Sequence, residues 1–188
     1  MTQSETITID RMTGVVNSKL RILALDMATV SGWAYAENGK LIGSGTVTFD
    51  VRRGESPGMR FLRFRQWLCE TWLPVLSRQP LDLVVYEQAH HRGGPATACG
   101  VGLTTTLLTW CAEHGVEHMP CHTATLKKHA ADTGHASKEQ MIDAALRRWG
   151  VIPFDDNEAD ALCLASWALD GFPQPESKKR KAKVTSKG

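Results

Sequence analysis

An Asn-Gly pair between two strand-like runs is the feature of this sequence that most constrains its fold. Asn38-Gly39 follows the apolar run 33–36 and precedes another strand-like run that continues to Phe49. Asn-Gly is typical of two-residue hairpins because both residues readily adopt a positive φ. A compact apolar run at 20–25 comes before the hairpin and leads into Asp26. The pattern predicts three consecutive antiparallel strands.

Helical and strand-like segments alternate after the hairpin. In order, they are a helix at 59–76, a strand at 81–86, a helix at 95–113, a strand at 116–119, and helical segments at 123–130, 138–149 and 157–169. A strand that follows a helix can return parallel to the first strand through a crossover connection. We therefore predict an α/β fold with a mixed five-stranded sheet, order β-β-β-α-β-α-β-α, and helices on both faces.

The length of 188 residues fits one domain, since a single core usually holds roughly 100–200 residues. We expect an N-terminal flexible segment at 1–19, one folded domain at 20–171, and a flexible tail at 172–188. The net charge is only +2, but the tail contains the dense cationic block Lys178–Lys183. Such a block attracts polyanions through phosphate contacts that weaken as salt rises.

Several classes of protein are excluded by what the sequence lacks. It has no run of 18 apolar residues and no secretory signal, so we expect a cytoplasmic protein, bacterial or in a phage-infected host cell, without a membrane partner. Its five cysteines are odd in number and contain no Cys-x-x-Cys pair. This pattern argues against a disulfide framework and a zinc ribbon, and predicts reduced, mostly buried thiols.

Three carboxylates are placed where they can meet. Asp26 and Glu87 end the first and fourth predicted strands, and the carboxyl ends of parallel strands lie side by side at the sheet edge where α/β folds bind ligands. Asp160 lies early in the last helix, where Asp156 and Asn157 can share its face. Clustered carboxylates raise each other's pKa, and divalent cations relieve that repulsion. Oxygen ligands favour Mg²⁺ or Mn²⁺, and two such ions support phosphodiester hydrolysis.

The sequence resembles the RuvC family of Holliday junction resolvases within the RNase H-like superfamily, and its form looks like a phage-type member. The segments that carry the resemblance are Leu23-Ala24-Leu25-Asp26 with Ser31-Gly32-Trp33-Ala34, Val84-Val85-Tyr86-Glu87-Gln88, Leu126-Lys127-Lys128 with Gly134, Ala136, Lys138 and Gln140, and Asn157-Glu158-Ala159-Asp160-Ala161-Leu162. They occur in family order over residues 20–170.

The resemblance implies a Mg²⁺-dependent homodimer, with two ions in each active site, that nicks two strands of a four-way or branched DNA. Asp26, Glu87 and Asp160 match the metal-binding catalytic carboxylates. Lys127 and Lys138 match lysines near the scissile DNA, where an ammonium group holds phosphate and balances charge. Lys128 and Arg92 are further DNA-binding candidates, and His90 and His91 share the Arg92 loop.

Asn157 departs from the family pattern, which often has Asp or His at this position. An Asn carbonyl is a neutral metal ligand, so metal binding would weaken without being lost. The other interpretation is that Asn157 is the N-cap of the last helix, with Asp160 at N3. Asp156 or Glu158 could also compensate for the missing charge.

Several alternatives remain open at this stage. Asn157 also suits a protein that binds branched DNA without cutting it, and the same fold serves RNA-processing nucleases. An ATP-binding module is disfavoured because the chain is short and has no second Gly-rich phosphate loop. The apolar stripe of the helix at 95–113 supplies either a dimer face or simply the core. His114, His118 and His122 lack metal-ligand spacing and are assigned no role.

Overall fold

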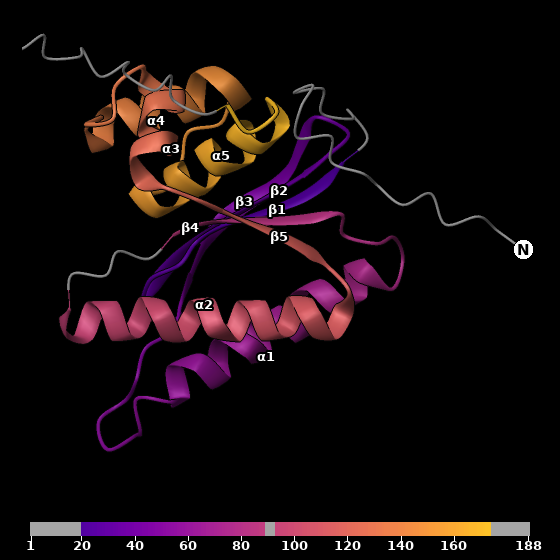
Figure 1. The fold of residues 1–188 in the computed structure, drawn as a ribbon, viewed down its shortest axis with the longest axis vertical. Helices are drawn as coiled ribbons and strands as arrows, with labels where there is room; N and C mark the ends of the chain where they lie inside the picture. The colour runs from indigo at the N-terminus through magenta and orange to yellow at the C-terminus, as the bar shows by residue number, and fades with distance from the viewer. Residues whose placement is uncertain (1–19, 89–92, 174–188) are drawn as a thin grey trace, which may run out of the picture.

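The structure, a computed structural model, describes residues 20–88 and 93–173 and is a single mixed sheet covered on both faces by helices (Figure 1). Its elements are β1 (Arg21–Asp26), β2 (Val30–Glu37), β3 (Lys40–Thr48), α1 (Met59–Leu76), β4 (Leu83–Glu87), α2 (Gly94–His114), β5 (Glu117–Cys121), α3 (Thr123–Ala131), α4 (Lys138–Trp149) and α5 (Asp156–Leu169). The predicted α/β class, the five strands and the three helical segments after the last strand are confirmed.

The sheet has the strand order β3-β2-β1-β4-β5. β1 and β2 pair antiparallel, as do β2 and β3, and the turn between β2 and β3 places Asn38 and Gly39 at φ 52° and 76°. These are the positive values that a two-residue hairpin requires, and they explain why Asn and Gly stand there. The predicted antiparallel meander is confirmed.

The other half of the sheet is parallel, as predicted. β4 pairs parallel with β1, with Leu25 opposite Tyr86, and β5 pairs parallel with β4, with Glu87 opposite Cys121. Both crossovers pass through helices of the same face, α1 and α2, which lie together on one side of the sheet (Figure 1). The carboxyl ends of β1, β4 and β5 therefore meet at one edge.

Two cores lie on opposite faces of the sheet because side chains alternate along each strand. Ile22 and Ala24 of β1 pack under α3, α4 and α5, whereas Leu23 and Leu25 pack against α1 and α2. α5 packs against β1, β2, β3 and β4 and is buried on almost all sides. A helix buried this deeply holds its side chains in fixed positions relative to the strands.

The stripe on α2 belongs mainly to the core. Leu103, Leu107 and Trp110 are fully buried beneath the sheet, and Val101 is exposed.

The five cysteines are free thiols, as expected, and Cys111, Cys121 and Cys163 are buried. No described helix is both long enough and apolar enough to cross a bilayer.

Some expectations fall outside the described residues. These are the N-terminal segment 1–19, the loop residues His90, His91 and Arg92, and the basic block Lys178–Lys183. At the start of the expected tail, Phe172 packs edge-on against Trp167, whose indole Nε1 donates to the carbonyl of Pro173 at 3.1 Å. The chain is thus attached to α5 up to residue 173.

Candidate active site

Asp26 and Glu87 stand on neighbouring parallel strands at the same edge of the sheet. Each is the last residue of its strand, and the pair just before them, Leu25 and Tyr86, is in register. Both carboxylates are half-buried. The placement expected from the sequence, with two acids side by side at a sheet edge, is what the strand pairing produces.

α5 brings Asp160 to the same edge. Burial raises the pKa of Asp26 well above its ordinary value, and the negative charges of Glu87, Asp160, Asp156 and Asp155 raise that pKa further, in that order of importance. Charges that act on Asp26 in this way lie on the same side of the molecule as Asp26 and near it. The three acids singled out in the sequence therefore form one cluster.

A glycine permits this approach of α5 to the sheet. A Cβ on Gly32, in β2 directly opposite Asp26, would lie 1.9 Å from the backbone oxygen of Asn157. No side chain can be accommodated at that distance, so the first turn of α5 rests directly on the strand backbone. The loop between β1 and β2 is held by Ser31, whose hydroxyl accepts from the Ala28 N–H at 3.1 Å and donates to the Ala28 carbonyl at 2.8 Å.

The interpretation of Asn157 as the helix N-cap is wrong. Asp155 is the cap, with an extended backbone and a side chain that accepts from the Glu158 N–H at 2.9 Å, and Asn157 lies inside the first turn. Aspartate caps a helix at least as well as asparagine, and its charge also suits the positive end of the helix dipole. The position of Asn157 next to Asp156 and three residues before Asp160 keeps it near the cluster.

Glu158 does not supply the charge that Asn157 lacks. It is buried, and its two oxygens accept from the Ser44 hydroxyl at 2.6 Å and from the Phe154 N–H at 2.7 Å. This carboxylate therefore fastens β3 and the loop before α5 to the helix. Asp156 is also engaged, through an ion pair with the Lys138 ammonium group that keeps the pKa of Asp156 below its usual value.

The cluster has the electrostatic character of a cation site. Burial, together with the charge of Glu87, raises the pKa of Asp160 to about 7. Asp160 Oδ1 is buried and has no hydrogen-bond partner among the residues that the structure describes. Carboxylates with raised pKa values and an unsatisfied oxygen are compensated by a divalent cation with oxygen ligands. Within residues 20–88 and 93–173, no three such side chains already surround one point as ligands, so a cation would have to draw them inward.

Thr123 is a site residue that the sequence reasoning missed. Its hydroxyl donates a hydrogen bond to Glu87 Oε1. β5 lies beside β4, so the first residue of α3, which directly follows β5, lies next to the end of β4. No local pattern distinguishes Thr123 from any other threonine at a helix start, because its role depends on the pairing of these two strands.

Two of the three lysines face the carboxylates. The charges of Lys127 and Lys138 both lower the pKa of Asp160, against the larger effect of burial. Lys127 is half-buried on α3, whereas the Lys138 side chain is 74% exposed at the start of α4. Lys128, the next residue of α3, is exposed.

The Gly134–Gln140 segment has a structural explanation. Ser137 caps α4 by accepting from the Gln140 N–H at 3.3 Å, and the Gln140 side chain accepts from the Ser137 N–H at 2.9 Å. This reciprocal capping box determines where α4 begins. It places Lys138 in the first turn, within reach of Asp156.

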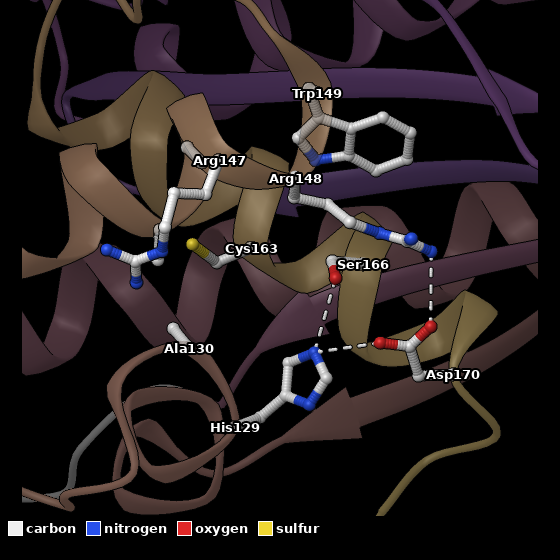
Figure 2. A pocket seen from close by; sticks show the side chains of 10 residues that line it. His129, Ala130, Arg147, Arg148, Trp149, Cys163, Ser166 and Asp170 are labelled. Atoms are coloured by element: carbon white, nitrogen blue, oxygen red, sulfur yellow. Dashed lines mark hydrogen bonds and ion pairs between the residues drawn. The ribbon is translucent and has the colours of Figure 1, made fainter.

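A separate cavity of about 240 Å³ lies between α3, α4 and α5 (Figure 2). In it, His129 Nε2 lies 3.2 Å from Ser166 Oγ and 3.5 Å from Asp170 Oδ2, and Arg148 donates to Asp170 Oδ1 at 3.1 Å. A serine-hydrolase triad uses the two imidazole nitrogens separately, one for serine and one for aspartate. Because both contacts here involve Nε2, this trio does not have the geometry of a nucleophilic triad.

Comparison with known proteins identifies the fold. Neither a protein-family model nor a curated protein matches the sequence. Among solved structures, T. thermophilus RuvC in complex with a Holliday junction substrate matches with a TM-score of 0.66 and 22% identity, over 83% of this chain and 99% of that chain. A second Thermus thermophilus RuvC structure gives a TM-score of 0.64 with the same identity and coverage. The yeast mitochondrial Holliday junction resolvase matches with a TM-score of 0.55 and 12% identity, over 82% of this chain and 81% of that chain. The fold is that of RuvC-type resolvases, as the sequence resemblance implied.

Proposed function

We propose, from this fold and the carboxylates at its sheet edge, that the protein is a metal-dependent, structure-selective DNA endonuclease. It would resolve Holliday junctions or related branched DNA by paired phosphodiester hydrolysis. The observation that carries the proposal is the convergence of Asp26, Glu87 and Asp160, with the pKa values of Asp26 and Asp160 raised, at the edge where parallel strands end. One structure of the same fold, T. thermophilus RuvC, holds a Holliday junction substrate.

In this proposal Asp26, Glu87 and Asp160 hold Mg²⁺, with Mn²⁺ as a substitute, and the Asn157 carbonyl is a neutral additional ligand. When bound there, two ions would make a coordinated water more acidic and would stabilise charge on the leaving oxygen. The Thr123 hydroxyl holds the Glu87 carboxylate in one orientation, as the neighbours of metal ligands commonly do. The protein is thus expected to be inactive in EDTA.

The lysines would bind the phosphate backbone around the cut. Lys127 is half-buried near Asp160, which suits a group that balances charge at the reacting phosphate. Lys138 is exposed and paired with Asp156. A DNA phosphate next to Lys138 can therefore contact its ammonium group while Asp156 stays bound to it. Lys128 and Arg92 would add further contacts to DNA. Because each site cuts one strand, paired nicks require two sites, and we infer a homodimer.

The test is cleavage of a labelled four-way DNA junction compared with linear duplex and structured RNA, in Mg²⁺ or in EDTA. We expect paired nicks in the junction alone, only with metal, and none with Asp26→Asn although that variant still binds the junction. Tight junction binding without nicks would instead favour a protein that binds branched DNA without cutting it. Preferential cleavage of RNA would assign the fold to RNA processing. Full activity of Asp26→Asn would remove Asp26 from the active site.

A further inference from the structure

The loop between β3 and α1, residues 49–58, leaves the sheet at the edge that carries the carboxylates. β3 and β1 both pair antiparallel with β2, so they run in the same direction and end at the same edge. Phe49, the first residue after β3, donates its N–H at 2.8 Å to the carbonyl of Thr29, which lies three residues after Asp26. From there the loop leads away from the sheet and extends past the start of α1 (Figure 1). It therefore begins beside the candidate active site and projects outward from it.

Side chains of α1 hold this loop in one conformation. Arg60 Nε donates to the Phe49 carbonyl at 2.9 Å, and Arg63 donates to the Asp50 carbonyl. Arg63 also donates to both carboxylate oxygens of Glu55, at 2.8 and 2.6 Å. Two parallel hydrogen bonds between a guanidinium and a carboxylate fix direction as well as distance. The loop is therefore fastened to α1 on both sides of its tip.

The tip of the loop is a tight turn that presents two arginines. The Glu55 N–H donates to the Arg52 carbonyl at 3.0 Å, and the Arg52 N–H donates to Glu55 Oε2 at 2.8 Å. Gly54 has φ 86°, close to the value that the third residue of a type II turn requires. Arg53 is the second residue of this turn, and both Arg52 and Arg53 are exposed. A contact made by either side chain would cost little backbone entropy, because the turn is already formed.

The guanidinium groups of Arg52 and Arg53 form no ion pair in the part of the chain that the structure describes. The acids of the loop act on Arg63 instead. Its hydrogen bonds with Glu55, and to a smaller extent the charge of Asp50, raise the pKa of Arg63. A guanidinium presents several N–H donors in one plane, which match the oxygens of a phosphate group. The turn thus has the chemistry of a phosphate contact.

We propose that Arg53, with Arg52 beside it, binds the phosphate backbone of a duplex arm that leaves the candidate active site past the end of β3. This inference rests on the proposed function and adds to it a contact outside the cluster of acids. Only β2 separates β3 from β1 in the sheet, so the loop begins two strand spacings, about 10 Å, from the end of β1. Contacts with phosphates fix the orientation of DNA without reading its sequence. The turn would therefore align one arm with the carboxylates, whatever the sequence of that arm.

The experiment measures junction binding and the path of the DNA together. Arg53→Gln and Arg53→Lys are each made in the Asp26→Asn background, so that the DNA stays intact. Binding of a labelled four-way junction is titrated at several salt concentrations, and hydroxyl-radical footprinting shows which stretches of backbone the protein covers. Arg78→Gln in the same background is the matched control. Arg78 is also exposed, but it follows α1 at the opposite edge of the sheet, where β4 begins.

We expect Arg53→Gln to bind the junction about 10-fold more weakly, because a hydrogen-bonded charge is lost. The slope of the logarithm of the binding constant against the logarithm of salt concentration should fall by about 1, since one phosphate contact is removed. Protection should disappear from one stretch of an arm and remain at the branch point. Arg53→Lys should keep the slope, and Arg78→Gln should match the parent protein in affinity, slope and footprint. The melting temperature of each variant should be unchanged, because these side chains are in water.

Two results would overturn the inference. One is an Arg53→Gln protein with the affinity, slope and footprint of its parent. The other is an Arg78→Gln protein that loses as much of the slope, which would mean that any surface charge contributes equally. If the Asp26→Asn parent binds junctions and either result is found, the inference alone fails. If neither that parent nor the wild-type protein binds any branched DNA, the proposed function fails as well.

Discussion

Replacing Asp160 by Asn should stabilise the metal-free protein at neutral pH. The fold raises the pKa of Asp160 from 3.8 to about 7, so ionising this carboxylate costs free energy in the folded state that it does not cost in the unfolded state. About 3 pKa units at roughly 1.4 kcal/mol each set an upper limit near 4 kcal/mol. Because Asp160 is half-buried and solvent screens part of this effect, we expect about 2 kcal/mol.

The dependence on pH follows from the direction of the shift. A carboxylate with a raised pKa contributes stability below its unfolded pKa of 3.8, and the folded state loses that stability as the pH rises through about 7. The amide of the Asp160→Asn variant does not titrate. The difference in stability between this variant and wild type should be small at pH 4, grow through pH 5 and 6, and level off above pH 7.

The assay is urea or thermal unfolding in EDTA across this pH range. For a chain of this size, about 2 kcal/mol corresponds to a rise of roughly 4–8 °C in melting temperature. Adding Mg²⁺ at about 100 times its Kd should stabilise wild type by about 2.7 kcal/mol and close the gap. Asp143→Asn, on the exposed face of α4, is the matched control, because it makes the same chemical change at a side chain in water.

Two results would refute this reasoning. The first is an Asp160→Asn variant that is no more stable than wild type at pH 7.5 in EDTA. The second is a stability difference that does not change between pH 4 and pH 7.5. Either would mean that Asp160 carries no electrostatic strain in the folded state and that the case for a cation beside it is lost.

Three further predictions concern neighbouring residues. Gly32→Ala should lower the free energy of unfolding by roughly 1–3 kcal/mol and reduce the stabilisation by Mg²⁺, because its Cβ would meet the Asn157 carbonyl. A variant whose denaturation curve matches that of wild type would contradict the close contact. Thr123→Val should raise the Mg²⁺ concentration needed for cleavage about 10–100-fold, and Thr123→Ser should need the same concentration as wild type. Equal Mg²⁺ titrations of all three proteins would show that Glu87 does not need the hydrogen bond from Thr123. Lys138→Met should leave the free energy of unfolding unchanged, because the ion pair of Lys138 is exposed. It should slow cleavage and should reduce by about 1 the slope of the logarithm of the DNA-binding constant against the logarithm of salt concentration. An unaltered slope would place Lys138 away from the DNA.

The positions of Asp26 and Glu87 could be predicted because local signals define them. Compact apolar runs and the Asn38-Gly39 turn are read from neighbours in the chain, and each strand ends where its apolar run ends. The rule that a strand after a helix returns in parallel then places the two acids side by side. The helix that carries Asp160 was also predicted, as a segment that begins after Pro153, although its cap is Asp155 and not Asn157.

Other parts of the site depend on contacts between distant segments. Thr123 and Glu87 are 36 residues apart and Ser44 and Glu158 are 114 apart, and neither hydrogen bond has a counterpart in local sequence. Gly32 matters because α5 comes to rest on it, which no strand pattern reveals. Each of these roles arises from the packing of α3 and α5 against the sheet.

The sequence alone thus determined the element types, the parallel half of the sheet and the acids that end its strands, because these depend on near neighbours. Only the tertiary structure decided which carboxylates change their chemistry. Asp160 has a raised pKa and Asp156 a lowered one, although both lie in the first turns of the same helix. The difference arises because desolvation and charge act through space, and burial beside Glu87 or pairing with Lys138 exists only once the chain is folded.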